Sequence, residues 1–390
     1  MKWINLLHLY QPAHTDAHII VEATEKSYKR LVRALQENPK IKFTFNITGC
    51  LFKRWEILGY HQLIQDVDSL IKKGQLELTG SAAYHPILPL VPKEEVKTQI
   101  LENEDILKSH FGDNFKPKGF FLPELAYSTE VGKIISSLGY TWIVLDEIAY
   151  CGKLNQVNYK KLYQDKVSGL KIIFRNRKHS KSYVPDTMHK INNSSTNSSN
   201  GIVIVTATDA ELYGLRHEDF SGEFEKLLQV NNFSSQTISE YISGFEETEK
   251  IRPISSNWES TEKDLVEKKP FALWFEKENP IQQKLWELAK LAINTIENSK
   301  KDDSYYWARW HLVRGLSSCS FWWASAKDFR LFGPISWNPD EIERGVNELI
   351  RSIRALDDIT TRQTKMKAEK LYIKIKQMVW EKHWTYYWKK

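Results

Sequence analysis

Short apolar runs alternate with amphipathic stretches along the first half of the chain. The runs are rich in β-branched and aromatic residues and end at turn residues, which is typical of strands buried on both faces. The predicted strands are Trp3–His8, Phe43–Ile47, Leu76–Thr79, Gly119–Leu122, Trp142–Leu145, Ile172–Phe174 and Ile202–Thr206. Between several of them, apolar residues recur at helical spacing, as at Leu63, Val67 and Leu70. This alternation predicts a parallel sheet with helices outside it.

Seven strand–helix units predict a closed, slightly short barrel, and an open doubly wound sheet stays as the alternative because periodicity alone does not close a sheet. Segment 191–200 is almost entirely Asn, Ser and Thr and is predicted to be a mobile loop, since it can bury very little. After residue 270 long helices are predicted, at Ile281–Asn298, Tyr305–Ala326, Pro339–Leu356 and Thr361–Trp388. We therefore expect a (β/α)7 barrel over residues 1–270 and a C-terminal helical bundle over residues 271–390.

Composition narrows the class of protein further. The formal charge of +6, from 55 basic and 49 acidic residues, is modest for 390 residues and calls for neither nucleic acid nor an anionic membrane as partner. No apolar run is long enough to span a membrane, and the N-terminus lacks the pattern of a signal peptide. Three widely separated cysteines suit a reducing compartment, so we expect a cytoplasmic protein. The 14 Trp and 17 Tyr residues supply flat faces on which sugars can stack.

Polar and aromatic residues follow six of the seven predicted strands, at the strand ends where parallel β/α barrels build their sites. The candidates that follow these strands are His8, Tyr10, Gln11, His85, Glu124, Asp146, Arg175, Asp209 and Glu211. Glu124 and Asp209 stand out because each comes directly after an apolar strand, which fixes its backbone. Two rigidly held carboxyl groups are what glycoside cleavage needs, one ionised and one protonated. The alternative for each is a structural role, as a helix cap or a turn residue.

The other candidates allow more than one interpretation. His8 and His85 could bind a substrate, bind a metal or pack in the core, and Asp146 and Arg175 could orient sugar hydroxyls or form an ion pair. The predicted stacking surfaces are Trp258, Trp274, Trp322 and Trp323. His14 and His18 have a spacing that could hold a metal on a helix, although no third ligand is evident nearby.

Four short stretches of the sequence that contain these candidates together resemble the motif regions of glycoside hydrolase family 57. The matching strings are His8-Leu9-Tyr10-Gln11-Pro12, Gly80 with His85-Pro86, Phe121-Leu122-Pro123-Glu124 and Asp209-Ala210-Glu211-Leu212-Tyr213-Gly214. The later stretches 256–258 and 270–279 resemble the family's later region and the start of its helical domain, and 317–323 resembles a helix of that domain that borders the cleft. The order of the strings and their places at strand ends make the resemblance specific. One departure is Tyr10, which stands where the family has a second His.

The resemblance implies an incomplete (β/α)7 barrel with a helical domain, and a retaining enzyme of α-glucans or maltooligosaccharides that needs no cofactor and no metal. Glu124 would be the nucleophile and Asp209 the acid/base. Two other functions stay open. One is a non-catalytic α-glucan-binding relative, prompted by Tyr10. The other is a metal-dependent polysaccharide deacetylase on a related barrel, which would need His8, His85 and Asp209 around a cation. The oligomeric state is not predicted.

Overall fold

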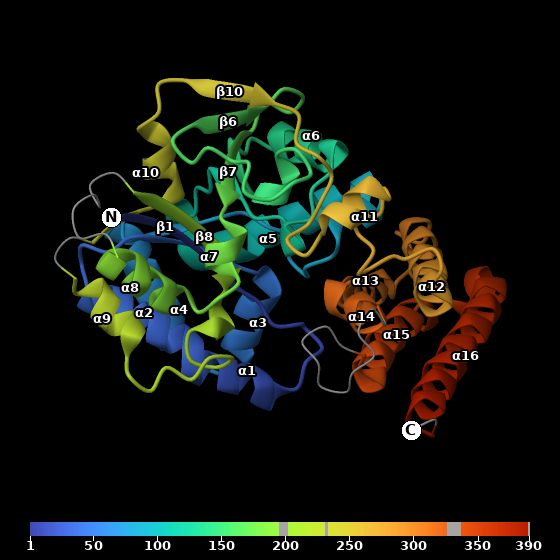
Figure 1. Cartoon of the computed structure of the whole chain (residues 1–390). Coiled ribbons are helices and arrows are strands. Elements are labelled where there is room, and N and C mark those ends of the chain that lie inside the picture. Colours follow the sequence, from blue (N-terminus) through green and yellow to red (C-terminus); the bar gives the residue numbers. More distant parts are fainter. Residues whose placement is uncertain (195–201, 231–232, 326–336, 389–390) are drawn as a thin grey trace. The chain divides into compact units, whose positions relative to one another are not determined.

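The structure is a computed structural model that describes residues 1–194, 202–230, 233–325 and 337–388 (Figure 1). The chain divides into two compact units, which we describe separately. The first unit consists of Met1–Gln11, Thr15–Ala83 and Leu88–Pro270. The second consists of Phe271–Lys390 together with two short segments from the N-terminal part of the chain, Pro12–His14 and Tyr84–Ile87.

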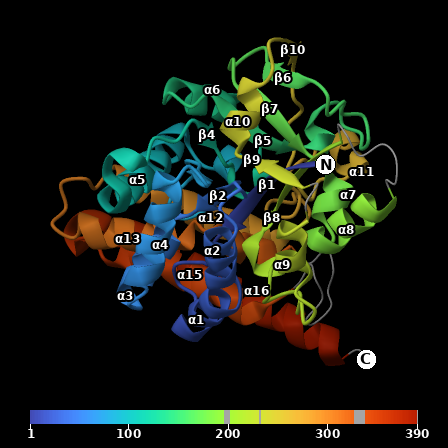
Figure 2. The same ribbon diagram turned by 90° about the vertical axis from the view of Figure 1, so that its left-hand side faces the viewer.

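Seven parallel strands form the barrel of the first unit, as the alternation of apolar runs predicts. They are β1 (Lys2–Leu9), β2 (Phe43–Ile47), β3 (Leu76–Leu78), β4 (Gly119–Phe120), β5 (Trp142–Asp146), β7 (Lys171–Arg175) and β8 (Val203–Asp209). Continuous ladders join them into two sheets, in the orders β3-β2-β1-β8 and β7-β5-β4. Figures 1 and 2 show these strands in the middle of the unit, with helices such as α2 (Lys29–Glu37), α4 (His61–Lys72) and α8 (Val184–Ser194) outside them.

The two sheets meet at two seams of different strength. At the first seam, a parallel bridge joins Gly80, just after β3, to Phe120 of β4. At the second seam, between β7 and β8, the backbone N–H of Asn176 donates to the carbonyl of Val205 at 2.9 Å. Side chains complete this seam, because Arg175 donates to the carbonyl of Ala207 at 2.7 Å and Ser180 accepts from the Ala207 N–H at 3.3 Å. The barrel is therefore closed less regularly here than elsewhere.

Helices surround the barrel, and short 3-10 and π turns separate several of them from the strands. The helices of the first unit are α1 (Ala17–Ala23), α2 (Lys29–Glu37), α3 (Gly49–Ile57), α4 (His61–Lys72), α5 (Lys93–Phe111), α6 (Thr129–Ser137), α7 (Arg177–Ser180), α8 (Val184–Ser194), α9 (Glu223–Leu228), α10 (Ile238–Ser243) and α11 (Glu262–Val266). The short turns are η1 (Thr24–Tyr28), η2 (Leu88–Leu90), η3 (Gly112–Asn114), η4 (Pro123–Leu125), η5 (Glu147–Ala149) and η6 (Ala210–Leu212). Because α8 runs to Ser194, the loop predicted for 191–194 is wrong, and the rest of that predicted loop, 195–200, lies outside the described residues.

Three further strands extend the sheets: β6 (Leu162–Asp165), β9 (Ser234–Gln236) and β10 (Thr248–Ile251). β6 runs antiparallel to β7, β10 pairs with β6, and β9 pairs with the first residues of β1. The sequence analysis missed them because they are short and carry polar residues. Two glycines let the barrel pack closely, since a Cβ on Gly119 would lie 2.1 Å from the ring of Trp142 and one on Gly80 would lie 2.0 Å from the hydroxyl of Tyr140.

The second unit is helical, with α12 (Pro280–Glu297), α13 (Tyr305–Gly315), α14 (Ser318–Trp323), α15 (Pro339–Arg354) and α16 (Asp358–Trp388). The single helix predicted at Tyr305–Ala326 is wrong, because the chain breaks between α13 and α14 and Ala326 lies outside the described residues. At the break Ser317 has an extended backbone, with ψ 136°, and the next N–H, of Ser318, donates to the carbonyl of His85 at 3.0 Å. A segment distant in sequence thus ends one helix and starts the other.

Candidate active site at the carboxyl ends of the barrel strands

Strand pairing places His8 between two polar neighbours. The register of the ladders sets His8 of β1 opposite Asn46 of β2 on one side and opposite Asp209 of β8 on the other. The Nδ1–H of His8 donates to Oδ1 of Asn46 at 2.7 Å. Burial lowers the pKa of His8 to about 4, against the smaller raising effects of Asp209 and Asn46. The imidazole is therefore neutral around neutral pH and offers a polar group without a charge.

Aromatic rings connect His8 to the strand end that carries Glu124. The His8 ring lies parallel to that of Phe121, with ring centroids 4.5 Å apart, and the ring of Tyr10 lies parallel to it at 5.7 Å. Trp258 meets both His8 and Phe121 edge-on, at 6.2 and 6.3 Å. All four rings of this aromatic cluster belong to the first unit. Their contacts connect the end of β1, which carries His8, to the end of β4, which precedes Phe121.

Glu124 follows β4 on the short turn η4, in a left-handed backbone conformation with φ 59° and ψ 17°. A non-glycine residue in this region costs on the order of 1 kcal/mol, so the surrounding structure must hold it there. The N–H of Trp258 donates to the carbonyl of Glu124 at 3.1 Å, and an antiparallel bridge joins Tyr127 to Ser256. The hydroxyl of Tyr127 donates to buried Asp165 at 3.0 Å. The half-buried Glu124 side chain is thus presented from a firmly anchored turn.

Asp209 is the last residue of β8, and its side chain is 23% exposed. Its Oδ2 accepts a hydrogen bond from Nη1 of Arg216 at 2.7 Å, in an ion pair whose arginine side is 56% exposed. Asp209 pairs with His8 in the ladder, and His8 stacks on Phe121, three residues before Glu124. The structure therefore brings Glu124, Asp209, His8 and their aromatic neighbours to the carboxyl edge of the same barrel.

Glu211 lies beside Asp209 but is buried, at 2% exposure. Its carboxylate accepts from the Tyr28 hydroxyl, and its Oε1 accepts from Nε2 of Gln11 at 2.8 Å. Burial raises the pKa of Glu211 to about 7; Arg216 lowers it and Asp209 raises it. A carboxyl group that titrates near neutral pH next to a candidate catalytic acid makes Glu211 part of the site's electrostatics. Gln11 reaches the site through this hydrogen bond.

Asp146 and Arg175 form a buried ion-pair cluster, the alternative that the sequence left open. Asp146 accepts from Nε of Arg175 at 2.8 Å and from Nη2 of Arg177 at 2.6 Å. The remaining donors of Arg175 reach the carbonyls of Ala207 and Trp258, at 2.7 and 3.2 Å. With their polar groups engaged inside the protein, neither residue is proposed as a sugar ligand. Trp258, 9% exposed and 5.1 Å from the Arg175 guanidinium, packs against the aromatic cluster and offers a sugar little surface.

Four predicted site residues belong to the second unit, at His85, Trp274, Trp322 and Trp323. His85 is buried, and its Nδ1 lies 2.9 Å from the Ser318 hydroxyl. Trp274 is completely buried, so it presents no face for stacking and we leave it out of the proposed site. Trp322 and Trp323 are half-buried neighbours in α14, with ring centroids 4.6 Å apart, and stay proposed stacking surfaces.

In the described ranges, no three His, Cys, Asp or Glu side chains gather closely enough to hold a metal ion. His14 and His18 do not share a helix, because α1 begins at Ala17 and His14 lies in the loop before it. The deacetylase alternative is therefore not pursued.

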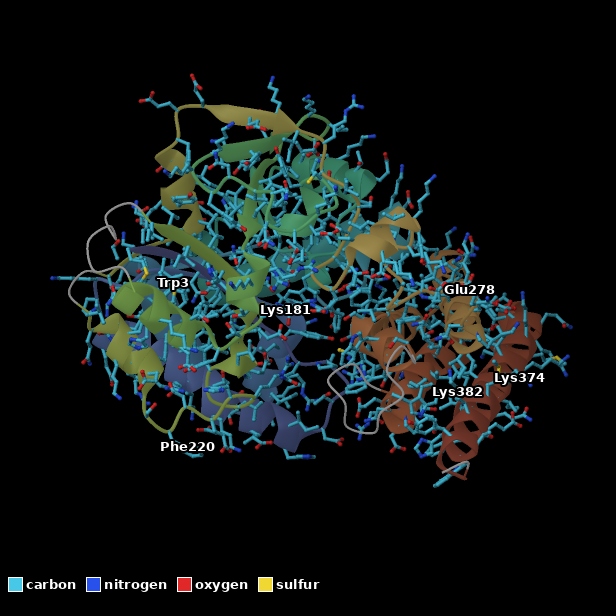
Figure 3. All side chains as sticks on the ribbon, in the orientation of Figure 1. Trp3, Lys181, Phe220, Glu278, Lys374 and Lys382 are labelled. Atoms are coloured by element: carbon cyan, nitrogen blue, oxygen red, sulfur yellow. The ribbon has the colours of Figure 1, made fainter. Side chains whose placement is uncertain are left out.

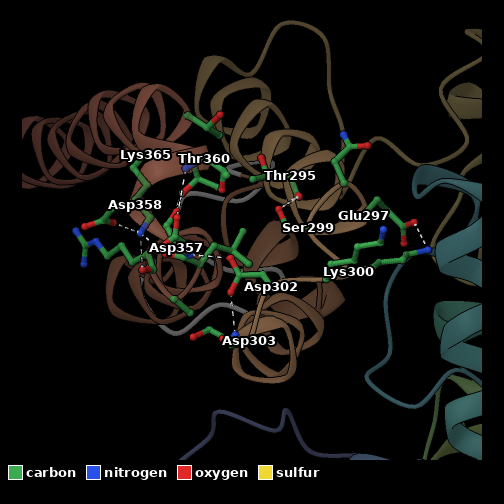
Figure 4. A pocket seen from close by; sticks show the side chains of 18 of the residues that line it. Thr295, Glu297, Ser299, Lys300, Asp302, Asp303, Asp357, Asp358, Thr360 and Lys365 are labelled. Carbon is green, nitrogen blue, oxygen red and sulfur yellow. Dashed lines mark hydrogen bonds and ion pairs between the residues drawn. The ribbon is translucent and has the colours of Figure 1, made fainter.

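A polar groove of ≈ 1240 Å³ lies in the second unit, between the ends of α12, α13, α15 and α16 (Figure 4). Two ion pairs form within the groove, Lys300 with Glu297 at 2.9 Å and Lys365 with Asp358. It contains none of the predicted site residues, and none of its lining residues is aromatic. It therefore lacks the stacking surface that a sugar site needs.

Sequence reasoning missed two residues of the site, Asn46 and Arg216. Asn46 lies near the carboxyl end of the predicted strand Phe43–Ile47, the one strand that yielded no candidate. A polar residue at that position of an apolar strand is the signal that could have identified it. Arg216 lies seven residues beyond Asp209, in a segment without a recognisable element. Only the turn of the chain after η6 brings its side chain back to the strand end.

Fold and site together define a (β/α) barrel protein with two candidate catalytic carboxyl groups at strand ends and a following helical unit. The family model described as Glycosyl hydrolase family 57 matches residues 2–254, which include both carboxyl groups, and the chain belongs to this family. None of the helices within the described ranges is both long enough and apolar enough to cross a bilayer.

Comparisons with individual proteins agree with this assignment. An α-amylase from Pyrococcus horikoshii is 30% identical over 141 residues, which are 36% of this chain and 22% of the amylase. The chain thus spans about a fifth of the length of the curated relatives that it matches. A 4-α-glucanotransferase structure from Thermococcus litoralis has a TM-score of 0.74 at 19% identity, over 92% of this chain and 60% of that one. A family 57 branching enzyme from Thermococcus kodakaraensis has a TM-score of 0.70 at 13% identity, over 95% and 94%. At such identities the structural likeness concerns the fold.

Proposed function

We propose that the protein cleaves α-glucosidic bonds of α-glucans or maltooligosaccharides with retention of configuration, through a covalent glycosyl-enzyme intermediate. Family membership and the names of the similar proteins, an α-amylase, a 4-α-glucanotransferase and a branching enzyme, support this substrate class. The observation that carries the proposal is the connection from Asp209 through His8 and Phe121 to Glu124, which puts two carboxyl groups at one edge of the barrel.

In this mechanism Glu124 attacks the anomeric carbon while Asp209 gives its proton to the departing glycosidic oxygen. The anchored turn around Glu124 favours attack, because a nucleophile whose backbone is fixed loses little freedom on the way to the transition state. Asp209 then removes a proton from the acceptor, which attacks the intermediate and releases the product from Glu124. Buried, neutral His8 packs against the rings of Phe121 and Tyr10 and does not compete for that proton.

The identity of the acceptor sets the type of reaction. Water as acceptor gives hydrolysis, whereas a sugar hydroxyl gives transfer or branching. A direct experiment is to incubate the protein with maltoheptaose and with amylose, and to resolve the products by size and linkage. Shorter sugars mean hydrolysis, a ladder of longer and shorter sugars means transfer, and new α-1,6 linkages mean branching. Glucan binding without any turnover would favour the non-catalytic alternative that Tyr10 prompts.

The roles of Glu124 as nucleophile and Asp209 as acid/base can be distinguished with alanine variants. Their activity is measured with and without azide on an activated aryl maltoside. We expect Glu124→Ala and Asp209→Ala to lose about 10³-fold or more of the maltoheptaose-cleaving activity. Azide should rescue the aryl maltoside reaction in both, giving an inverted glycosyl azide with Glu124→Ala and a retained one with Asp209→Ala. The matched control is Glu130→Gln, an exposed residue of α6, which should keep wild-type rates. Full activity of Glu124→Ala would end the assignment.

A further inference from the structure

Arg216 covers the carboxyl group that the proposed mechanism uses as its acid. Its Nη1 lies 2.7 Å from Oδ2 of Asp209, so it occupies one of the two oxygens through which this carboxyl group could give its proton. A carboxylate in an ion pair with a guanidinium is the ionised form, whereas proton donation requires the protonated form. The pair therefore has to open before Asp209 can act as a proton donor.

The backbone around Arg216 is fixed, so any change must come from its side chain. Its own N–H and that of Leu215 donate to the carbonyl of Glu211, at 2.7 and 3.1 Å. Three residues further on, Asp219 accepts from Arg30 and from the Tyr183 hydroxyl, each at 2.7 Å, and from two N–H groups at the start of α9. These bonds hold the chain on both sides of Arg216.

The side chain of Arg216 is more exposed than its partner. It is 56% exposed, whereas the carboxyl group that it pairs with is only 23% exposed. The segment that carries it reaches the surface, where Phe220 is 91% exposed and points away from the ribbon (Figure 3). A long side chain on a fixed backbone can turn from the carboxylate into solvent at the cost of one partly exposed ion pair, which is a weak interaction.

Arg216 faces more than one ionisable group. Asp209 comes from β8, Glu211 from η6, Tyr28 from η1 and His8 from β1. Burial keeps His8 neutral by lowering its pKa to about 4, and burial raises the pKa of Glu211 to about 7, against the lowering effect of Arg216. When Arg216 leaves, that lowering effect is lost and the protonated form of Glu211 is favoured. Movement of the Arg216 side chain therefore favours a protonated carboxyl group in the site.

We propose that Arg216 is a positioning residue of the reaction: it closes on Asp209 in the unliganded protein and must swing away when an α-glucan binds, so that substrate binding includes the breaking of this ion pair. The inference rests on the proposed function. As the pair opens, Asp209 takes one proton from solvent, and it later gives that proton to the leaving oxygen. No other co-reactant is needed.

The test is a direct binding measurement in a background without turnover. Maltoheptaose is titrated calorimetrically into Glu124→Gln and into Glu124→Gln/Arg216→Gln. Because the double variant has no pair to break, its affinity should be about two- to fivefold higher. Raising NaCl from about 0.05 to about 0.5 M should strengthen binding to Glu124→Gln, since salt screens the exposed pair, and should leave the double variant unchanged. Glu124→Gln/Arg216→Lys should keep the salt effect, because Lys keeps the charge.

The control variant is Glu124→Gln/Arg33→Gln, which removes the same charge from an exposed position of α2 and should bind like Glu124→Gln. Weaker binding by the Arg216→Gln double variant would overturn the inference, because Arg216 would then hold the sugar directly. Equal affinity and equal salt dependence would overturn it as well. Wild-type protein without turnover of maltoheptaose would instead overturn the proposed function and the inference with it. If the wild type cleaves maltoheptaose and Asp209→Ala does not, the proposed function stands whatever the result for Arg216.

Discussion

Glu211 is a buried carboxyl group whose two hydrogen bonds do not compensate for the water it has lost. Burial raises its pKa to about 7, whereas an unfolded chain would ionise it around 4.5. Between these two pH values the folded protein keeps a proton that the unfolded chain has lost. The contribution of Glu211 to stability is therefore present below about pH 4.5 and is lost as the pH rises through about 7.

We expect Glu211→Gln to remove the loss of stability that Glu211 causes as the pH rises. The amide oxygen can still accept from Tyr28 and Gln11, so the packing is kept. The free energy of unfolding of the variant, relative to wild type, should rise between about pH 5 and about pH 8 by on the order of 2 kcal/mol. Urea denaturation at both pH values measures it. The neighbouring His8 has the opposite pH dependence, but it is present in both proteins and cancels in the difference. Parallel pH curves for the two proteins would contradict this account.

At the scale of elements, one buried carboxylate joins β5, β7 and the segment around Trp258. Asp146 accepts from two guanidinium groups, of Arg175 and Arg177, and from the N–H of Ile148 at 3.1 Å. Arg175 carries the connection to the weak seam, through the carbonyl of Ala207, and Arg177 carries it to the carbonyl of Ser260 at 2.7 Å. The cluster thus takes over part of the task that a continuous ladder performs elsewhere in the barrel.

Asp146→Asn should be strongly destabilising, because it leaves two buried cations without their counter-charge. We expect the free energy of unfolding to fall by about 3 to 5 kcal/mol, as measured by guanidinium denaturation. The same exchange at exposed Asp113 should change stability by no more than about 0.5 kcal/mol. A change as small as this at Asp146 would mean that the cluster does not hold the seam.

The barrel could be predicted because its strands are apolar runs whose length and spacing are local properties of the sequence. Strand ends then identified Glu124, Asp209 and His8 without any knowledge of contacts. The partners could not be found in this way. Whether Arg175 meets a sugar or Asp146, and which side chain meets Asp209, depends on how segments distant in sequence pack together. The break between α13 and α14 has the same origin, because the carbonyl that Ser318 bonds belongs to His85.

At the scale of the whole molecule, the helical unit is not a simple C-terminal addition. Pro12–His14 and Tyr84–Ile87 follow the first and third barrel strands in sequence but belong to the second unit. Within that unit, His85 bonds to Ser318 through both its carbonyl and its ring. A cut at residue 270 therefore does not separate the units cleanly.

We expect a protein truncated after Pro270 to be less stable than the barrel within the full chain. Removal of Phe271–Lys390 takes away both hydrogen bonds that Ser318 makes with buried His85 and exposes the apolar side chains beside it. The midpoint of thermal unfolding, followed by circular dichroism, should fall by about 5 °C or more, and the fragment should bind a hydrophobic dye. A fragment that unfolds at the same temperature as the full chain would show that the two segments contribute nothing to stability.

The division of the barrel into two sheets has a chemical consequence. Asp209 is carried by the sheet β3-β2-β1-β8, and Glu124 follows β4 at the edge of the other sheet. The distance between these two carboxyl groups therefore depends on how the two sheets pack against each other, and no single loop determines it. Glycosidases with narrowly and widely spaced acids give opposite stereochemical outcomes. Repacking far from the sugar, along the line where the halves meet, is therefore a route by which this scaffold could exchange one outcome for the other.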